Sequence, residues 1–530
     1  MFTDFRTIKD GIIIKADFCI IGAGPAGITI ARELNKGKQR VCMVESGGFD
    51  SAPETQALYE GENIGQPYFD LDICRLRYFG GTTNHWNGQC APLSQMDFEE
   101  RPWVPHSGWP ISKADLDPYY LKALPVCEIG PYNFEAQAWT NWGIVPPSFN
   151  PEKIQSHFWQ NSPPTRFGQV YRKELESAEN ITVLLNANVT HIRTDKSGEK
   201  VTHVDLSALN GKKGQVRANV FVLACGGMEN PRLLLISNDV QPEGLGNKYD
   251  LVGRFFMDHN TALCGKVELV DAEYLLKTYK PKHFQGIRYR PGLKMGEEEQ
   301  KQKQVLNICA TFKQEDTVPQ GIKAGRQLVN DLGELEFEDI DDHILTILGD
   351  LDDVADYVGC RLDGVEDCAK DVYLRTRQEQ APNPLSRVSL SQELDVLGSP
   401  RLRLDWQFTE LDRKSLKAMA LTLGSEFGRL NMGRVQLPTW YVEDREPEWI
   451  SASYHHMGTT RMADNPSNGV VNKDCRVHGL ENLYVAGSSV FPTSGFVNPT
   501  LTIVALALRL ADHLSMNGKE TASSSGDVSG

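Results

Sequence analysis

The sequence predicts an α/β fold built around a sheet of parallel strands. Residues 16–22, ADFCIIG, form a short apolar run that is typical of a buried parallel strand. A glycine-rich turn follows, and residues 28–37 then carry apolar side chains at helical spacing. Residues 40–48, RVCMVESGG, predict a second strand, so this segment has the strand–helix–strand order of a parallel sheet. The sequence also predicts strands separated by turns in three later stretches: 181–192, 201–209 and 219–227.

Composition and charge narrow the class of protein. The chain has 530 residues, which is roughly three to four domains' worth of chain at about 150 residues each. Its hydrophobic share of 40% and charged share of 24% are ordinary for a soluble globular enzyme. The formal net charge of −15 argues against a general nucleic-acid binder and against docking on anionic membranes, because both partners select for a basic surface.

No segment predicts export, a membrane span or a metal site. The most apolar late stretch, 501–508, is far shorter than the about 20 residues that a spanning helix needs. The N-terminus has neither a basic region followed by a long apolar one nor a twin-arginine pair. The 11 cysteines form no CxxC pair, which favours reduced, mostly buried thiols and no bound zinc. We therefore expect a cytoplasmic protein without a metal.

Three stretches predict structure without chemistry. Residues 50–125 are rich in Gly, Pro and Asn and predict loops with short helices. Residues 331–356 hold 11 acidic residues and no lysine or arginine, without the pattern of a calcium-binding loop. Isoleucine, leucine and valine recur there every three or four residues, from Ile340 to Val358, which favours an amphipathic helix with a solvated acidic face. Residues 519–530 are small and polar and predict a disordered tail.

The first turn of the predicted sheet has the pattern of a dinucleotide site. Gly22, Gly24 and Gly27 form G-x-G-x-x-G between the first strand and its helix. The first glycine permits a tight turn, the second lets a pyrophosphate approach the backbone, and the third lets the helix pack closely on the strand. Glu45 ends the next strand, where a carboxylate accepts hydrogen bonds from ribose hydroxyls. The segment predicts a bound dinucleotide, with FAD and NAD both open.

Three further segments carry motifs in a distinctive order. They are 80–87 (GGTTNHWN), 222–235 (VLACGGMENPRLLL) and 454–514, which contains HHMGTTRM and FVNPT. Together with the glycine-rich turn, they resemble the glucose–methanol–choline (GMC) family of FAD-dependent oxidoreductases. The pair His85–Trp86 and the late Asn-Pro-Thr are most similar to the bacterial sugar-oxidising and pyranose oxidase branch. The resemblance covers both ends of the chain but not clearly residues 265–450.

This resemblance implies how the chain is divided. A discontinuous, Rossmann-like FAD-binding domain is implied for residues 1–100, 170–265 and 455–515. Residues 101–169 and 266–454 are implied to form a substrate domain and connecting loops, with an antiparallel sheet and helices over the reactive face of the flavin.

The resemblance also implies which residues contact FAD. We expect these contacts from Gly22, Gly24, Pro25, Ala26, Gly27, Glu45, Ser46, Gly81, Thr82, Asn84, His85, Trp86, Asn87, Val189, Gly487, Asn498 and Thr500. In the pyranose oxidase branch, the histidine at the place of His85 is bonded to the flavin, so a covalent link is an alternative there. We prefer non-covalent contact, because most members of the family bind FAD without a bond. Asn87 stands where pyranose oxidases have threonine, a departure that weakens the case for strong reactivity with oxygen.

Oxidation of an alcohol needs a base, because the hydroxyl proton must leave as the hydride moves to flavin N5. Histidine has a suitable pKa for this task. The family's pattern His-x-x-Gly-Thr begins here at His455, which is thereby implied as the base. His456 is the competing candidate, since neighbours in an extended chain point to opposite sides. The family's partner position falls on Asn498, whose amide can bind the substrate oxygen but cannot act as a base. Asn498 also fits a helix N-cap.

The implied reaction is oxidation of a secondary hydroxyl, at C2 or C3 of a pyranose or glycoside, to the ketone. Non-sugar or primary alcohols, and a non-redox lyase on the same fold, are alternatives, while an NAD-dependent dehydrogenase leaves the C-terminal block unexplained. Oxygen and other electron acceptors both stay open, as does the oligomeric state. Five histidines outside the motifs are expected to be structural: His191, His259, His283, His343 and His513.

Overall fold

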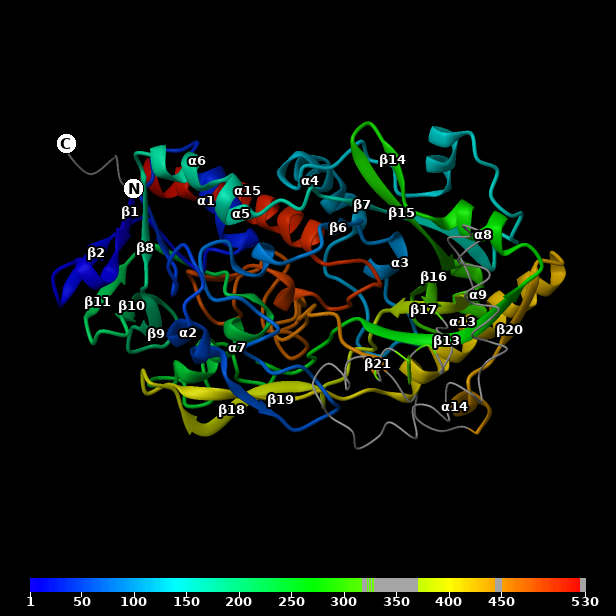
Figure 1. The fold of residues 1–530 in the computed structure, drawn as a ribbon. Helices are drawn as coiled ribbons and strands as arrows, with labels where there is room; N and C mark the ends of the chain where they lie inside the picture. The colour runs from blue at the N-terminus through cyan, green and yellow to red at the C-terminus, as the bar shows by residue number, and fades with distance from the viewer. Residues whose placement is uncertain (317–321, 323, 326, 328–369, 444–449, 525–530) are drawn as a thin grey trace.

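The computed structural model describes the whole chain except residues 317–321, 323, 326, 328–369, 444–449 and 525–530. Six parallel strands form the sheet at the N-terminal side of the molecule (Figure 1). Their order is β1 (Phe2–Asp4), β8 (Ile181–Leu185), β4 (Val41–Val44), β3 (Phe18–Ile21), β12 (Val220–Leu223) and β22 (Leu483–Val485). All residues of β3 and β4 are buried, as their continuous apolar runs predict. The predicted α/β fold is thus confirmed.

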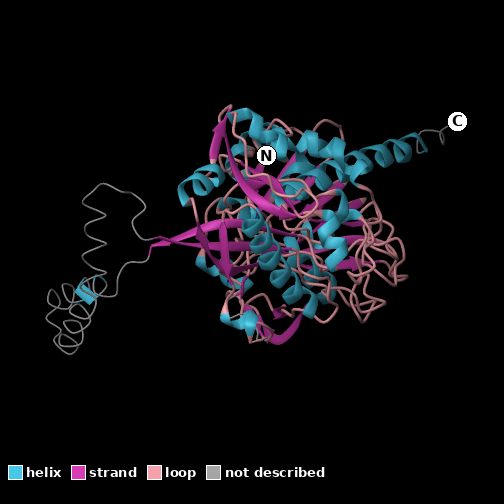
Figure 2. Ribbon diagram, turned by 90° about the vertical axis from the view of Figure 1, so that its right-hand side faces the viewer, coloured by secondary structure: helices cyan, strands magenta, loops and turns pink. Residues whose placement is uncertain are grey.

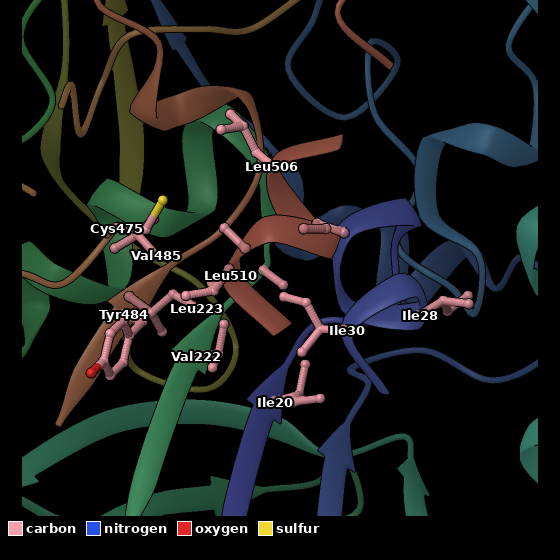
Figure 3. Close-up of a cluster of buried hydrophobic side chains, with 14 of the residues drawn as sticks. Ile20, Ile28, Ile30, Val222, Leu223, Cys475, Tyr484, Val485, Leu506 and Leu510 are labelled. Atoms are coloured by element: carbon pink, nitrogen blue, oxygen red, sulfur yellow. The ribbon is translucent and has the colours of Figure 1, made fainter. Parts of the chain in front are cut away.

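Two helices from opposite ends of the chain cover this sheet. α1 (Pro25–Leu34) follows β3, and α15 (Thr500–Ser524) is the last helix. Figure 3 shows the side chains of Ile30 on α1 and Leu510 on α15 beside Ile20 and Val222 of the strands. These buried contacts pack the middle of α15 against α1 and the parallel sheet.

The second large sheet is antiparallel and has nine strands. Its main order is β20 (Gly433–Gln436), β13 (Asn260–Leu269), β17 (Lys370–Gln378), β16 (Ile308–Asp316), β15 (Ile287–Met295), β7 (Ile154–Asn161) and β6 (Gln89–Cys90). Two short strands pair at its sides: β14 (Lys282–Phe284) with β15, and β21 (Ile450–Ser451) with β13. The long helix α13 (Glu410–Arg429) packs against this sheet through buried Leu416, Met419 and Leu423.

Two small sheets flank the large ones. One joins β2 (Ile12–Lys15), β11 (Lys213–Arg217), β10 (Val201–Ser207) and β9 (Asn188–Thr194), and the other joins β18 (Arg387–Leu394), β19 (Pro400–Asp405) and β5 (Gly61–Asn63). The predicted run 181–192 is therefore two strands in different sheets. The chain turns between them at Asn186, which has a positive φ of 56°.

Further helices connect these elements. They are α2 (Pro53–Gln56), α3 (Gln95–Phe98), α4 (Lys113–Val126), α5 (Phe167–Val170), α6 (Arg172–Ser177), α7 (Gly226–Ile236), α8 (Ala272–Tyr279), α9 (Glu297–Lys303) and α14 (Thr439–Val442). The prediction of only short helices in 50–125 is wrong for α4, which has 14 residues. Ser112 and Asp115 form a capping box at its start, a signal that the glycine- and proline-rich surroundings obscured.

The C-terminal helix is longer than predicted. α15 continues to Ser524, and Figure 2 shows its end projecting beyond the rest of the molecule. Residues 519–524 of the predicted tail are therefore helical, whereas 525–530 lie outside the described residues. The predicted acidic helix around Ile340 to Val358, with His343, also lies outside them.

The described residues show neither a membrane-spanning helix nor a metal-binding cluster. No helix among them is long and apolar enough to cross a bilayer. The same residues hold no cluster of three or more His, Cys, Asp or Glu side chains arranged for a metal ion. Nine described cysteines are free thiols, and all of these except Cys225 are buried.

Candidate active site

A cavity of about 560 Å³ opens along the carboxyl ends of β3 and β4. Its wall includes the glycine-rich turn, the 81–89 loop and the start of α15, and it reaches β17 of the antiparallel sheet. The two sheets that the chain assembles from distant segments therefore share one cavity. Ligands of open parallel sheets bind at this edge of the strands.

Two glycines of the turn are needed for close packing of the backbone, and the third leaves space in the cavity. A Cβ at Gly22 would lie 2.6 Å from Ala224 O, and one at Gly27 would lie 2.0 Å from Gly22 O. A Cβ at Gly24 would meet no atom within 4 Å, although Gly24 lines the cavity. Gly24 is also the N-cap of α1 and offers no side chain to its free N–H groups. The start of α1 is thus open to an anion.

Glu45 faces the same cavity from the end of β4. Its Oε2 accepts a hydrogen bond from Ala23 N at 2.9 Å, and its Oε1 accepts one from Gly47 N at 2.9 Å. These bonds fix the carboxylate beside the turn. Oε1 also accepts from Ser46 Oγ at 3.2 Å, so Oε2 keeps the further lone pair that can accept a ribose hydroxyl.

Most of the predicted cofactor contacts line the cavity. They are Gly22, Gly24, Pro25, Ala26, Glu45, Ser46, Gly81, Thr82, His85, Trp86, Asn87, Val189, Gly487, Asn498 and Thr500. Gly27 and Asn84 do not line it. Gly27 lies under the turn, and Asn84 Nδ2 donates to Phe79 O at 3.0 Å, which holds the 80–87 loop in shape.

The predicted base and its partner lie together at the far end of the cavity. Asn498 Nδ2 is 3.2 Å from His455 Nε2, although the two residues are 43 positions apart. Asn498 Oδ1 accepts a hydrogen bond from Arg377 Nη1 at 2.6 Å. The Asn498 side chain thus contacts two other side chains of the site, one through each end of its amide.

The hydrogen-bond directions around His455 follow from its neighbours. Arg377 can only donate, so Asn498 turns its oxygen toward Arg377 and its NH₂ toward His455. On the other side, His455 Nδ1 lies 2.8 Å from His259 Nδ1, and His259 Nε2 lies 3.4 Å from Ser494 O. A carbonyl only accepts, so His259 carries its proton on Nε2 and accepts at Nδ1. His455 therefore carries its proton on Nδ1 and presents a lone pair at Nε2.

Burial keeps both rings neutral. The pKa of His455 lies well below its usual value because the ring is desolvated and because His259 and Arg377 add positive potential. Burial, followed by the charge of Arg377, lowers the pKa of His259 to about 3. At neutral pH, His455 is therefore free to accept a proton at Nε2.

Asp258 holds the backbone around both histidines. Its Oδ1 accepts from His259 N at 2.6 Å and from His455 N at 3.0 Å, and its Oδ2 accepts from Tyr68 OH at 2.6 Å. Burial raises the pKa of Asp258 to about 6, against the opposing effect of these bonds. This carboxylate ties the start of β13 to the 453–455 segment.

His456 has different surroundings. Its ring packs at 5.9 Å from the ring of Phe256 and at 6.1 Å from that of Tyr68, and Nε2 has no hydrogen-bond partner. Burial, followed by the charge of Arg75, lowers its pKa to about 3. His456 also borders the cavity, but its ring makes no contact with Asn498 comparable to that of His455.

Several residues of the site were not predicted from the sequence. His259 was expected only to pack, yet it contacts the predicted base. Arg375 and Arg377 of β17 line the cavity, and Arg377 orients Asn498. The alternation in Tyr-Leu-Arg-Thr-Arg, 373–377, was a signal that the two arginines share one face of a strand. Nothing in the sequence indicated which sheet face borders the cavity.

Comparisons with known proteins agree with the geometry. Residues 382–507 match the family model described as GMC oxidoreductase. This segment is therefore a GMC oxidoreductase C-terminal domain. The chain is 25% identical to the 6'''-hydroxyparomomycin C oxidase of Streptomyces lividus, over 94% of its own length and 92% of that protein. It is 34% identical to the C-glycoside 3-oxidase of Microbacterium trichothecenolyticum, over 28% of its own length and 26% of that protein.

A solved structure supports the same fold. Pyridoxine 4-oxidase from Mesorbium loti superimposes with a TM-score of 0.55 at 17% identity, covering 94% of this chain and 99% of that one. GMC oxidoreductases bind FAD. The cavity fits that cofactor, because Gly24 leaves space at an uncapped helix start and the Glu45 carboxylate can accept a hydrogen bond from a ribose. Cβ atoms at Gly226 and Gly487, which also line the cavity, would likewise meet nothing within 4 Å.

Proposed function

We propose that this protein oxidises a secondary hydroxyl, at C2 or C3 of a pyranose or glycoside, to the ketone. The observation that carries the proposal is the pair His455 Nε2 and Asn498 Nδ2, 3.2 Å apart in the same cavity as the dinucleotide turn. The names of two similar proteins, a C-glycoside 3-oxidase and a hydroxyparomomycin oxidase, support a sugar hydroxyl as the reacting group.

The two side chains have complementary tasks. A substrate hydroxyl that replaces their direct contact accepts a hydrogen bond from Asn498 Nδ2 and donates one to the lone pair of His455 Nε2. His455 then takes the hydroxyl proton at Nε2, while its Nδ1–H remains bonded to His259. Bound FAD supplies the hydride acceptor. Arg377 keeps the Asn498 amide in the orientation that this geometry needs.

In this proposal, residues near the flavin hold FAD in place without a covalent bond to it. His85 lines the cavity beside Trp86 and Asn87, and we propose that it contacts FAD non-covalently. Acid precipitation of the holoenzyme tests this point. All yellow colour is expected in the supernatant. Fluorescence that stays with the denatured chain and disappears in His85→Ala would instead identify a histidyl–flavin bond.

The substrate class is tested by anaerobic flavin reduction. The holoenzyme is mixed with a panel of pyranoses, glycosides and simple alkanols, and the loss of flavin absorbance is followed. Reduction by a pyranose or glycoside, with a 2- or 3-keto product found by mass spectrometry and NMR, is the expected result. Rapid reduction by an alkanol alone would contradict it, and so would turnover of a substrate without any flavin reduction, as in a lyase.

A further inference from the structure

Three arginines stand beside the predicted catalytic pair. Arg375 and Arg377 lie two residues apart on β17, so they share one face, while the alternate positions Leu374 and Thr376 are buried on the other. Arg290, on β15, joins them around a small hollow. Gln89, Arg375 and Arg377 line both this hollow and the main cavity, so the two spaces adjoin.

Among the described residues, these arginines have no carboxylate partner. Arg377 Nη1 donates to Asn498 Oδ1 at 2.6 Å and to Gln89 Oε1 at 3.2 Å, and both acceptors are neutral. Within the part of the chain that the structure describes, no Asp or Glu lies within ion-pair distance of Arg290, Arg375 or Arg377.

Of the four described arginines that are nearly fully buried, three are paired with carboxylates, and the fourth, Arg461, donates to His106 O. Arg75 meets Glu229 at 2.8 Å, Arg101 meets Glu379 at 2.6 Å and Arg232 meets Asp395 at 2.7 Å. Pairing is the usual condition for burying a charge. The half-buried cluster on β15 and β17 differs from these three pairs, and its members Arg375 and Arg377 line the main cavity.

The positive charge of the cluster is concentrated. Burial, followed by the charges of Arg290 and Arg375, lowers the pKa of Arg377 to about 10. Burial and the charge of Arg375 also lower the pKa of Arg290. A guanidinium with a pKa near 10 is still protonated at neutral pH. The positive charges of the neighbouring arginines therefore repel one another. A bound anion would relieve this repulsion, and carboxylates and phosphates match the guanidinium fork.

We propose that the substrate carries an anionic group, a carboxylate or a phosphate ester, which Arg290 and Arg375 bind while the adjacent CH–OH lies between His455 and Asn498. The inference rests on the proposed function and narrows its substrate to an anionic pyranose or glycoside. The net charge of −15 does not attract anions from bulk solution. Selection therefore acts by short-range contacts within the cavity.

Matched pairs of ligands test the proposal on the oxidised holoenzyme. Methyl β-glucoside is compared with methyl β-glucuronide, and glucose with glucose 6-phosphate. Binding is followed as a change in the flavin absorbance spectrum, which needs no turnover. At least one anionic member is expected to bind about tenfold or more tightly than its neutral counterpart, since hydrogen bonds to charged groups are the stronger ones. The uronide arm and the phosphate arm show which anion is preferred.

Variants assign the effect to the cluster. Arg290→Gln and Arg375→Gln are each expected to weaken binding of the anionic ligand about tenfold and to leave the neutral one unchanged. Arg375→Lys should restore part of the affinity, because it keeps the charge. Arg288→Gln is the control, since Arg288 lies two residues from Arg290 on the same strand but is exposed and lines neither cavity. Its binding should not change.

Two results would overturn the inference. One is equal binding of neutral and anionic members in both pairs. The other is an equal loss for both members in the glutamine variants, which would show that the arginines serve the flavin rather than the substrate. Reduction of the flavin by neutral glycosides without any preference for anions would leave the proposed function standing alone. An anion-dependent spectral change with no flavin reduction by any sugar would support the anion site and contradict the proposed oxidation.

Discussion

His259 Nδ1 lies 2.8 Å from His455 Nδ1, so a second histidine from the start of β13 holds the predicted base. The contact is part of a continuous row of hydrogen bonds from Arg377 through Asn498, His455 and His259 to Ser494 O. Each direction in the row is set by a group that can only donate or only accept. Its effect is to place the lone pair of His455 at Nε2, where it accepts from Asn498 Nδ2.

Replacing His259 tests this positioning role. His259→Leu removes the acceptor for His455 Nδ1–H, and we expect flavin reduction to slow about tenfold or more, since the imidazolium that forms at His455 loses its buried hydrogen bond. His259→Asn returns an oxygen near the same place and should recover much of the rate. FAD content and the neutral-ligand Kd should stay near normal in both variants. Equal damage in Leu and Asn variants would mean that the ring only fills space.

The pH dependence of flavin reduction follows from the lowered pKa of His455. The base must be neutral to accept a proton, and burial, with the positive charge of Arg377, favours the neutral form. The neutral form therefore persists to pH values below 6.5. Stopped-flow reduction at saturating substrate should be flat from pH 8 to 6.5 and should fall only at lower pH. An acid limb centred at or above pH 7 would contradict this assignment.

Asn498→Ala should slow flavin reduction less than removal of the base does. The variant deletes one hydrogen bond to the substrate oxygen and leaves His455 in place, so a loss of roughly 10- to 100-fold in the flavin reduction rate is expected, as for a hydrogen bond to a developing charge. The variant also frees Arg377 Nη1 from its 2.6 Å contact. A loss as large as that of His455→Ala would show that Asn498 does more than orient the substrate.

Gly24→Val tests the cofactor cradle. Gly24 has an ordinary φ of −81°, and its missing Cβ faces open space, so the substitution should be compatible with folding. The valine side chain would then occupy the place of the pyrophosphate, and FAD occupancy after purification should fall severely. Gly428→Ala in α13 is a control, because its Cβ also meets no atom within 4 Å but lies away from the cavity. Full flavin content in Gly24→Val would refute the assignment.

The strand–turn–helix at the N-terminus was predictable because its signals are local. The apolar spacing and the glycine-rich turn both lie within ten residues, which include Ile20, Gly22, Gly24 and Ile28. The proximity of His455 and Asn498 was predicted from the family resemblance. A single sequence does not show which distant residues lie together in the fold. His259 looked structural, because its contact with His455 depends on the bridge between Met257 and Met457. The arginines of β15 and β17 were visible as residues, but only the sheet order places them together.

The central claim is that His455, and not its neighbour, takes the substrate proton. It is tested most directly by anaerobic stopped-flow reduction of FAD-loaded His455→Ala and His456→Ala. Loss of the general base should slow flavin reduction by about 10²- to 10⁴-fold in His455→Ala. His456→Ala should stay within about tenfold of the unsubstituted enzyme, since its ring packs against Tyr68 and Phe256. A crippled His456→Ala beside a nearly normal His455→Ala would contradict the account.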